Sequence, residues 1–320
     1  MRKGLLIRLA IGLVVLVAVA ALVGCDEDGG PTPAVRATRQ EEATFPVGDA
    51  AVIDADTSNG EIIVRGVEGA QDVHVVVTLS TRGNTQEEAE ERLGKIVYRA
   101  SQDGQTIRLQ YKSNDQPTDV RRWSGVGFEV TVPVATRVDA ETSNGAITVE
   151  TVFGRLNLDT SNGAITVLQV TGDVVADTSN GRISMREITG DVKADTSNGR
   201  ISLERISGAV RADTSNGEIE LAAIAGEVIA DTSNGAIHYE GTPVGKSNRL
   251  RTSNGAITVR VPAEAAIDFE IDAKEGDIRS SLQLVGDTQG DHWEAALNPP
   301  VAASMSLRTT NGAVRIDRLP

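Results

Sequence analysis

The sequence predicts an all-β protein folded as a parallel β-solenoid, with 18-residue coils of two short strands each. Three observations lead to this prediction. Thr-Ser-Asn-Gly recurs every 18 residues from Thr142 to Thr232, and a fixed period is typical of stacked repeats. Apolar and polar residues alternate within each copy, as in strands with one buried face. The aromatic residues are only 2 Trp, 3 Tyr and 4 Phe, so the core must be thin and aliphatic.

The chain begins with the three parts of a signal peptide, over residues 1–25. Arg2 and Lys3 give a positive start, residues 9–23 are apolar, and the only cysteine, Cys25, follows Leu-Val-Gly. The apolar run is shorter than the ~20 residues needed to span a bilayer. The Leu-Val-Gly-Cys box resembles that of bacterial lipoproteins, which implies that Cys25 is acylated after cleavage. The alternative is an ordinary signal peptide, or an uncleaved anchor, with an incidental cysteine.

The next two segments are expected to connect this leader to the regular repeats. Residues 26–42 are rich in Pro, Gly and charge, which predicts a flexible tether. Residues 43–135 are expected to form an irregular N-terminal part of the β-repeat domain. Within it, Thr85-Gln86-Glu87-Glu88 is a capping box, which predicts one short helix ending at about Leu93.

Regular repeats are expected over residues 136–260, and degenerate coils with a cap over residues 261–320, where residues 309–319 form a final coil.

Two architectures fit the repeat. In an antiparallel meander each Asn-Gly would be a hairpin turn, but one face of the sheet would remain apolar and uncovered. In a solenoid that face is buried against the opposite side of the same coil. We therefore favour the solenoid, whose open ends need atypical terminal coils.

The Thr-Ser-Asn-Gly repeats, the strand Phe-Glu-Val-Thr-Val-Pro-Val at 128–134 and the lipoprotein box together resemble the adhesin-like β-strand-repeat family of bacterial surface proteins. The resemblance covers roughly residues 45–320. It implies a β-helix-like fold and a surface location. The family is a domain of unknown function, and its pattern contains no catalytic residues to transfer to this chain.

Two columns of polar residues are expected to stack, one residue per coil. The first column is acidic. We favour a local role for it, in which each carboxylate accepts hydrogen bonds from turn amides. The alternative is that Ca²⁺ is held between successive carboxylates. The second is a structural ladder of asparagines at the corners. The acidic column comprises Asp159, Asp177, Asp195, Asp213 and Asp231, and the ladder comprises Asn144, Asn162, Asn180, Asn198, Asn216 and Asn234.

Four further side chains are interpreted as structural. His238 and Tyr239 replace residues of the repeat beside a longer, 20-residue coil. Trp123 and Trp293 lie in the irregular flanks, where capping of the coil ends is favoured over a binding patch.

Charge and motifs exclude several function classes. The net charge of −14 disfavours nucleic acid as a partner. The sequence contains no nucleophile elbow or phosphate loop, and its carboxylates recur with the fold instead of clustering once. We therefore expect that the protein is not an enzyme and binds no cofactor.

The predicted function is that of a non-enzymatic, lipid-anchored scaffold on the extracytoplasmic face of the cell envelope, an adhesin or envelope-interaction protein. Its partners would be the membrane and an envelope or surface protein or glycan. The alternatives are a polysaccharide-active β-helix enzyme and a Ca²⁺-stabilised spacer.

Overall fold

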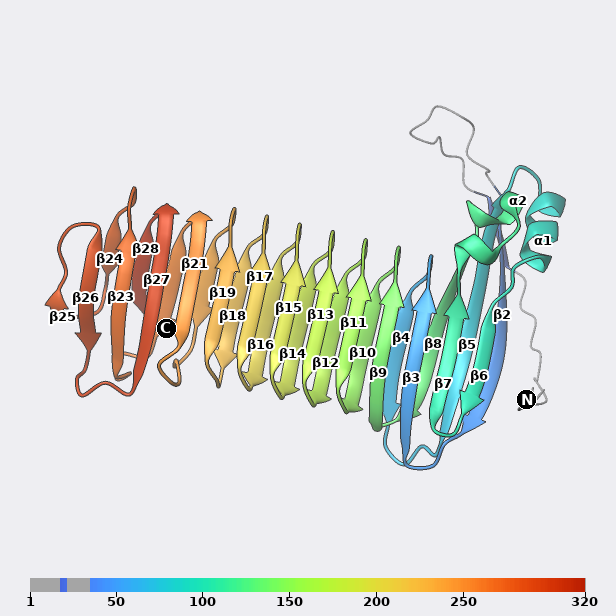
Figure 1. Ribbon diagram of the computed structural model, residues 1–320, viewed down its shortest axis with the longest axis horizontal. Coiled ribbons are helices and arrows are strands. Elements are labelled where there is room, and N and C mark those ends of the chain that lie inside the picture. Colours follow the sequence, from blue (N-terminus) through green and yellow to red (C-terminus); the bar gives the residue numbers. More distant parts are fainter. Residues whose placement is uncertain (1–17, 22–34, 320) are drawn as a thin grey trace, which may run out of the picture.

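The strands stack into a rod of two facing sheets, each of 14 strands (Figure 1). The structure is a computed structural model that describes residues 18–21 and 35–319. Cys25 lies outside the described residues. In the described part of the chain, no helix is long and apolar enough to cross a bilayer.

The first sheet contains the strands that follow each Thr-Ser-Asn-Gly corner. In spatial order it consists of β1 (Ala18–Ala21), β2 (Val35–Pro46), β5 (Asp72–Gly83), β8 (Gly125–Pro133), β4 (Ile62–Val67), β10 (Ile147–Phe153), β12 (Ile165–Thr171), β14 (Ile183–Thr189), β16 (Ile201–Ser207), β18 (Ile219–Ile224), β20 (Ile237–Glu240), β22 (Ile257–Val261), β28 (Val314–Arg318) and β24 (Ile278–Ser280).

The second sheet contains the strands that lead into each corner. In spatial order it consists of β25 (Val285–Asp287), β26 (His292–Leu297), β23 (Ile267–Ala273), β27 (Ala303–Asn311), β21 (Asn248–Asn254), β19 (Val228–Thr232), β17 (Val210–Thr214), β15 (Val192–Thr196), β13 (Val174–Thr178), β11 (Leu156–Thr160), β9 (Ala135–Thr142), β3 (Ala50–Thr57), β7 (Thr106–Tyr111) and β6 (Arg99–Asp103).

Neighbouring copies of the repeat run parallel, which confirms the solenoid and excludes the meander. Ile183 on β14 pairs with Ile201 on β16, and Asp195 on β15 pairs with Asp213 on β17. Partners are therefore 18 residues apart, so one repeat is one coil with one strand in each sheet.

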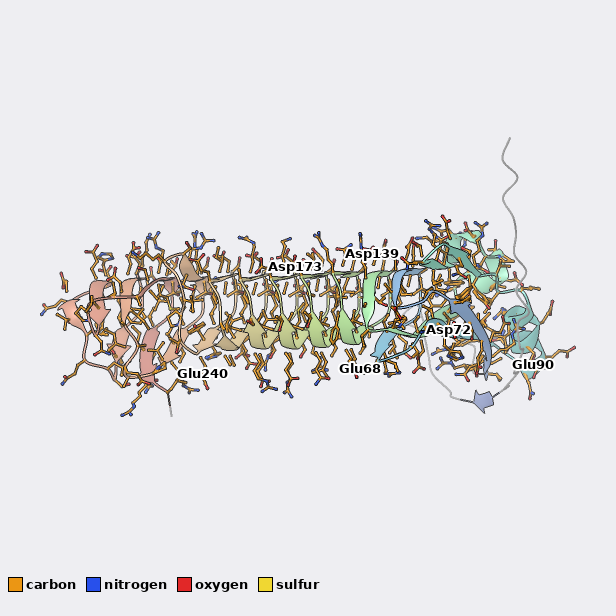
Figure 2. The ribbon with its side chains drawn as sticks, turned by 90° about the horizontal axis from the view of Figure 1, so that it is seen from below. Glu68, Asp72, Glu90, Asp139, Asp173 and Glu240 are labelled. Atoms are coloured by element: carbon orange, nitrogen blue, oxygen red, sulfur yellow. The ribbon has the colours of Figure 1, made fainter. Side chains whose placement is uncertain are left out.

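The core lies between the two sheets and is one coil wide. In one coil, Ile183, Met185 and Ile188 of the first sheet face Val192 and Ala194 of the second, and each is 2% exposed or less. Charged side chains such as Asp139, Asp173 and Glu240 lie outside the two layers (Figure 2). Because each coil packs against its own return strand, an aliphatic core is enough to cover both apolar faces.

A bulge in five of the coils explains why the buried positions of their strands in the first sheet do not follow a strict period of two. Glu187 has a φ of +60°, and residues at the same place in four other coils also have positive φ: Thr151, Gln169, Arg205 and Ala223. A left-handed residue within a strand reverses the alternation of side chains. Ile188 consequently points inward, three residues after Met185.

At both ends of the rod the spatial order of coils differs from their order in the sequence. The coil of β3 and β4 lies between the β7/β8 and β9/β10 coils, and the β27/β28 coil lies between β21/β22 and β23/β24. The expectation that residues 309–319 form the final coil is wrong in space, because β28 pairs with both β22 and β24. The chain's last coil therefore joins two earlier ones by inserting between them.

Antiparallel strands and helices cover the ends. β2 and β5 pair antiparallel at one end, and β25 pairs antiparallel with β26 at the other. The predicted helix is confirmed as α1 (Gln86–Gly94), where Thr85 Oγ1 accepts a hydrogen bond from Glu88 N at 3.2 Å. The single-turn α2 (Thr118–Arg121) and a 3₁₀ turn at Ser113–Asp115 were not expected.

The expected tether over residues 26–42 is wrong for residues 35–42. These residues belong to β2, which pairs with β5 along its full length. Ala37 and Phe45, on its inner face, are 0% and 8% exposed. Charged residues between these apolar positions concealed a strand pattern with one buried face.

Candidate functional site

The Thr-Ser-Asn-Gly corner determines which side chains the rod presents along its edge. In one coil, Thr196 is buried and its Oγ1 donates to Gly181 O of the preceding coil at 3.1 Å. A Cβ on Gly199 would lie 1.8 Å from the same carbonyl oxygen, so only glycine allows this approach of two backbones. The buried threonine and the glycine hold the corner, while Ser197 and Asn198 are left on the surface.

The asparagines of successive corners form one continuous ladder. Asn198 Nδ2 donates to Asn180 Oδ1 at 2.9 Å, and Asn198 Oδ1 accepts from Asn216 Nδ2 at 2.9 Å. Since each amide bonds to both neighbours, the column is bonded along the rod as a structural ladder would be. The structure brings together all six expected members and adds three more, Asn59, Asn254 and Asn311.

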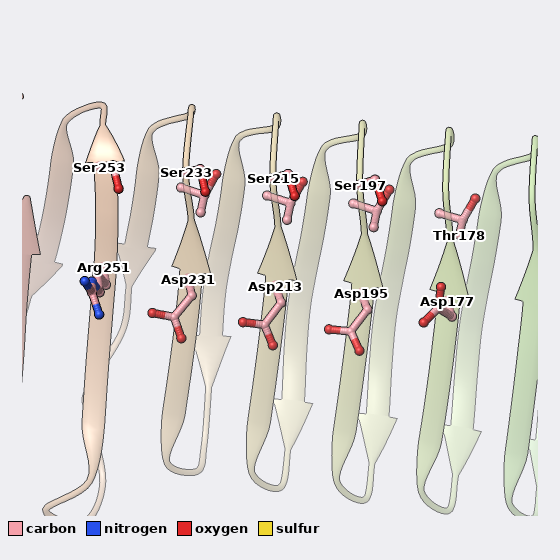
Figure 3. A pocket seen from close by; sticks show the side chains of 13 residues that line it. Asp177, Thr178, Asp195, Ser197, Asp213, Ser215, Asp231, Ser233, Arg251 and Ser253 are labelled. Atoms are coloured by element: carbon pink, nitrogen blue, oxygen red, sulfur yellow. The ribbon is translucent and has the colours of Figure 1, made fainter.

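The five predicted aspartates also lie in one column, on the outer face of the second sheet. Register pairs join Asp159 to Asp177, Asp177 to Asp195, Asp195 to Asp213, and Asp213 to Asp231. Figure 3 shows the last four on successive parallel strands. We call these five residues the acidic strip.

The structure extends the acidic strip beyond the residues found from sequence. Glu141 pairs with Asp159, and Asp56 pairs with Glu141. At the other end, Arg251 pairs with Asp231 and ends the run of negative charge. The spacing of the Thr-Ser-Asn-Gly copies at 57–60 and 142–145 was the signal that could have located Asp56 and Glu141.

Electrostatics divide the acidic strip into two parts. Lys193 Nζ lies 2.6 Å from Asp195 Oδ2, Arg211 Nε lies 2.8 Å from Asp213 Oδ2, and one further arginine contacts the last aspartate of the strip. By contrast, Asp159 and Asp177 form no ion pair with any residue the structure describes. Asp159 and Asp177 are therefore the two aspartates of the acidic strip without an ion pair to a described residue.

Two carboxyl groups of the acidic strip have pKa values above the usual range. For Asp177, partial burial and the neighbouring charges of Asp159 and Asp195 raise the pKa. For Asp213, burial raises the pKa and outweighs the opposing effect of Arg211. Both shifts mean that the folded rod disfavours this row of negative charge, so the strip would gain from a cationic partner.

An open groove of about 460 Å³ runs along four aspartates of the acidic strip, from Asp177 to Asp231. It lies between the aspartates and the corner serines, as Figure 3 shows for Asp195 with Ser197 and Asp213 with Ser215. Arg251 and Ser253 lie at its far end. Because the same groups recur on each coil, the groove offers a row of equivalent carboxylate and hydroxyl positions.

The aspartates do not converge as calcium ligands. Within residues 35–319, no group of three or more His, Cys, Asp or Glu side chains is placed to hold a metal ion. Ca²⁺ takes 6–8 oxygens around one point, whereas outward-facing carboxylates of parallel strands are spread along a line at about 4.8 Å per step.

A second groove, of about 480 Å³, lies on the first sheet beside the longer coil. Its lining includes His238, whose Nε2 lies 3.1 Å from Glu218 Oε1. Tyr239 also lines it but is 1% exposed, and burial raises the pKa of its phenol. Its hydroxyl has no hydrogen-bond partner among the described residues. The histidine thus makes a surface contact with Glu218, while the tyrosine is part of the core.

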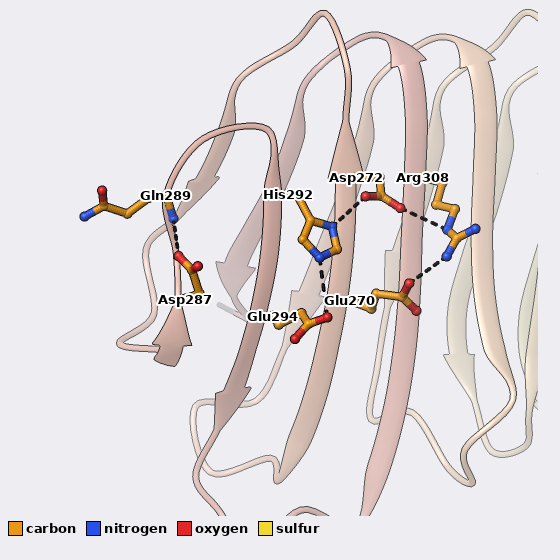
Figure 4. A network of polar contacts seen from close by, with 7 residues as sticks. All are labelled: Glu270, Asp272, Asp287, Gln289, His292, Glu294 and Arg308. Atoms are coloured by element: carbon orange, nitrogen blue, oxygen red, sulfur yellow. Dashed lines mark hydrogen bonds and ion pairs between the residues drawn. The ribbon is translucent and has the colours of Figure 1, made fainter.

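A polar network at the C-terminal end of the rod was not predicted (Figure 4). His292 Nδ1 lies 2.6 Å from Asp272 Oδ1, and Arg308 contacts both Asp272 and Glu270. Hydrogen bonds to Asp272 and Glu294 raise the pKa of His292, and Asp272 has the larger effect. Arg308 could have been located from the corner at 309–312, but the antiparallel strand that carries His292 has no signature in the repeat.

The two tryptophans lie near opposite ends of the rod. Trp293 lies on β26 and packs against the core, with its indole N–H buried and without a hydrogen-bond partner among the described residues. Trp123 lies two residues before the start of β8, and its ring centre lies 4.9 Å from the guanidinium carbon of Arg122.

Comparison with solved structures finds likenesses of low identity. A candidate adhesin from Parabacteroides distasonis is 9% identical, with a TM-score of 0.48, and the match covers 88% of this chain and 97% of that one. A candidate adhesin from Bacteroides fragilis is 13% identical, with a TM-score of 0.40 and the same coverage. Another from Parabacteroides merdae is 10% identical, with a TM-score of 0.37, and covers 88% of this chain and 96% of that one.

No curated protein matches the sequence. A family model does match, and it covers residues 51–317. That range includes the irregular N-terminal coils, all the regular repeats and the inserted last coil. The chain therefore belongs to the Toastrack DUF4097 family.

Proposed function

We propose that this protein is a lipid-anchored scaffold without enzymatic activity, which presents the acidic strip to an envelope or surface partner outside the cytoplasm. The observation that carries the proposal is the acidic strip itself. Its carboxylates recur once per coil, and four of the five line an open groove of about 460 Å³. A row of equivalent groups suits an extended partner that makes the same contact many times, since linked weak contacts reinforce one another.

The partner is expected to carry positive charge or hydroxyl groups. Asp159 and Asp177 form no ion pair with a described residue, and the raised pKa of Asp177 reflects burial and repulsion along the column, which outweigh the charge of the nearby Lys193. The corner serines beside them can donate and accept hydrogen bonds. A basic polypeptide segment or an amino-substituted glycan has the matching chemistry.

Repetition also argues against an active site in this groove. Catalysis requires a few groups held around one reacting bond. Along the acidic strip the same side chains return on every coil, and they point outward in a line. A scaffold needs repetition of this kind, whereas an enzyme needs one position that differs from the others.

The anchoring part of the proposal depends on Cys25. The protein with Cys25→Ser is expected to lose acylation and leave the lipoprotein fraction of the membrane, which metabolic labelling with a fatty acid would detect. Persistent labelling of Cys25→Ser would contradict lipidation at this residue.

The binding part can be tested with the full chain and immobilised poly-L-lysine. We expect binding that weakens as salt increases and is several-fold weaker for Asp159→Asn/Asp177→Asn. The matched control is Asp173→Asn/Asp191→Asn, which removes the same charge from exposed residues at the opposite corner. Equal weakening in both variants would show a response to net charge alone and would refute a role for the strip.

The same variants distinguish the calcium-stabilised spacer. If Ca²⁺ were held along the column, EDTA would lower the melting temperature of the wild type and have no effect on Asp159→Asn/Asp177→Asn. A melting temperature that is insensitive to both EDTA and added Ca²⁺ is expected of the scaffold.

A further inference from the structure

A basic hollow lies at the N-terminal end of the rod, where β2 and β5 meet the start of β8 (Figure 1). Its volume is about 400 Å³. Arg36, Arg82 and Arg122 line it together with Trp123, and none of its lining residues is an aspartate or glutamate. In a protein with a net charge of −14, Arg36 and Arg82 side by side are a local reversal of charge.

Two of these arginines face each other without compensation. Arg36 on β2 is the direct cross-strand partner of Arg82 on β5. Opposed residues of an antiparallel pair point to the same side, and like charges in this arrangement are destabilising. Neither guanidinium forms an ion pair within residues 35–319. By contrast, Arg186 on another coil contacts Glu204 at 3.0 Å.

Polar and aromatic groups complete the hollow. Thr81 also lines it, although its side chain is 1% exposed and lies on the buried face of β5, opposite to the exposed face that carries Arg82. Trp123 forms one wall, and the guanidinium of Arg122 lies over its ring. The opposed charges of Arg36 and Arg82 are the feature that a bound oxyanion would relieve.

We propose that the basic hollow binds a phosphate-type oxyanion. Arginine guanidinium groups match the geometry of such anions and bond them through two N–H groups at once. The anion would lie between Arg36 and Arg82, where it offsets their repulsion. Its source is either soluble phosphate or the headgroup of an anionic lipid.

The lipid source rests on the proposed anchoring at Cys25, whereas the soluble source does not. Arg36 is 11 residues after Cys25 in the sequence, which limits their separation to about 40 Å. An acylated Cys25 would therefore keep the basic hollow close to the membrane surface.

Tryptophan fluorescence can report on the basic hollow directly. The full chain has two tryptophans, so Trp293→Phe leaves Trp123 as the only one. In this background, the protein in nonionic detergent is titrated with inorganic phosphate at constant ionic strength. It is then reconstituted into phosphatidylcholine vesicles with and without phosphatidylglycerol.

The proposal expects a saturable change in Trp123 fluorescence. Arg36→Gln/Arg82→Gln should weaken binding about tenfold or more, because the charge-assisted hydrogen bonds to the anion are lost. The matched control, Arg155→Gln/Arg182→Gln, removes two exposed arginines elsewhere and should change affinity less than about twofold. Circular dichroism checks folding, and Arg36→Lys/Arg82→Lys, which keeps the charge, should retain part of the binding.

The outcomes separate the two sources and the proposal itself. A response to phosphate alone supports a soluble anion, and a further response to phosphatidylglycerol supports a lipid headgroup. The proposal is overturned by the absence of a saturable response to either probe, or by equal weakening in the control variant. If Cys25→Ser disproves anchoring, the phosphate titration still decides whether the basic hollow binds an anion.

Discussion

The hydroxyl of Thr196 allows a quantitative test of how successive coils are joined. The side chain is 6% exposed, and Oγ1 donates to Gly181 O of the preceding coil at 3.1 Å. Valine has nearly the same shape as threonine but cannot donate. Thr196→Val therefore removes this bond and leaves the carbonyl without that donor at a tightly packed corner.

The expected change in the free energy of unfolding is the balance between the lost hydrogen bond and the added methyl group. An intramolecular hydrogen bond contributes about 0.5–1.5 kcal/mol net, and a buried acceptor left unpaired costs about 1–3 kcal/mol. The added methyl group of valine returns about 0.8 kcal/mol when buried. We expect Thr196→Val to lower the free energy of unfolding by about 1–2 kcal/mol, which corresponds to about 2–6 °C in melting temperature for a domain of this size.

Thermal and urea unfolding, followed by circular dichroism, would measure this change. Ser197→Ala is the matched control, because Ser197 is exposed and its hydroxyl makes no hydrogen bond with a described residue. The control should remain within about 0.5 kcal/mol of the wild type. If both variants lose the same stability, or if Thr196→Val is more stable than the wild type, the threonine hydroxyl does not join the coils.

Three further predictions concern packing, backbone strain and pH. Gly199→Ala should destabilise the rod by about 2–3 kcal/mol in the same unfolding assay, because the new Cβ would lie 1.8 Å from a backbone oxygen. Gly94→Ala is the control and should be neutral or slightly stabilising, because no atom lies within 4 Å of its new Cβ. Thr151→Asn should raise stability by about 1 kcal/mol, since a β-branched residue there has a φ of +56°; lower stability would show that the threonine side chain has a packing role. The raised pKa of His292, caused mainly by Asp272, means that its contribution to stability is complete below about pH 6.5 and is lost as the pH rises through the folded-state value. His292→Gln should remove that part of the pH dependence in urea titrations between pH 6 and 8.5, and an unchanged pH profile would contradict it.

The period of the repeat could be predicted from sequence because it is a local property. Each copy carries its own corner and its own alternating strands, so the same residues take the same places in every coil. Stacking then puts Asp177 beside Asp195 and Asn180 beside Asn198. One coil therefore predicts the columns of the regular part.

The ends of the rod could not be predicted in this way. The insertion of the β27/β28 coil between two earlier coils depends on contacts between segments far apart in the chain. Likewise, Arg36 meets Arg82 only because β2 pairs with β5 in one particular register. Nothing near either arginine in the sequence specifies that partner.

By itself, the sequence determined the 18-residue coil, its thin aliphatic core and the columns along its edge, because spacing along the chain becomes spacing along the rod. Only the tertiary structure decided the spatial order of the terminal coils, the reversal at residues such as Glu187 and the basic hollow. Those features depend on which strand each free edge pairs with, and an exposed edge accepts any segment with matching alternation until packing selects one.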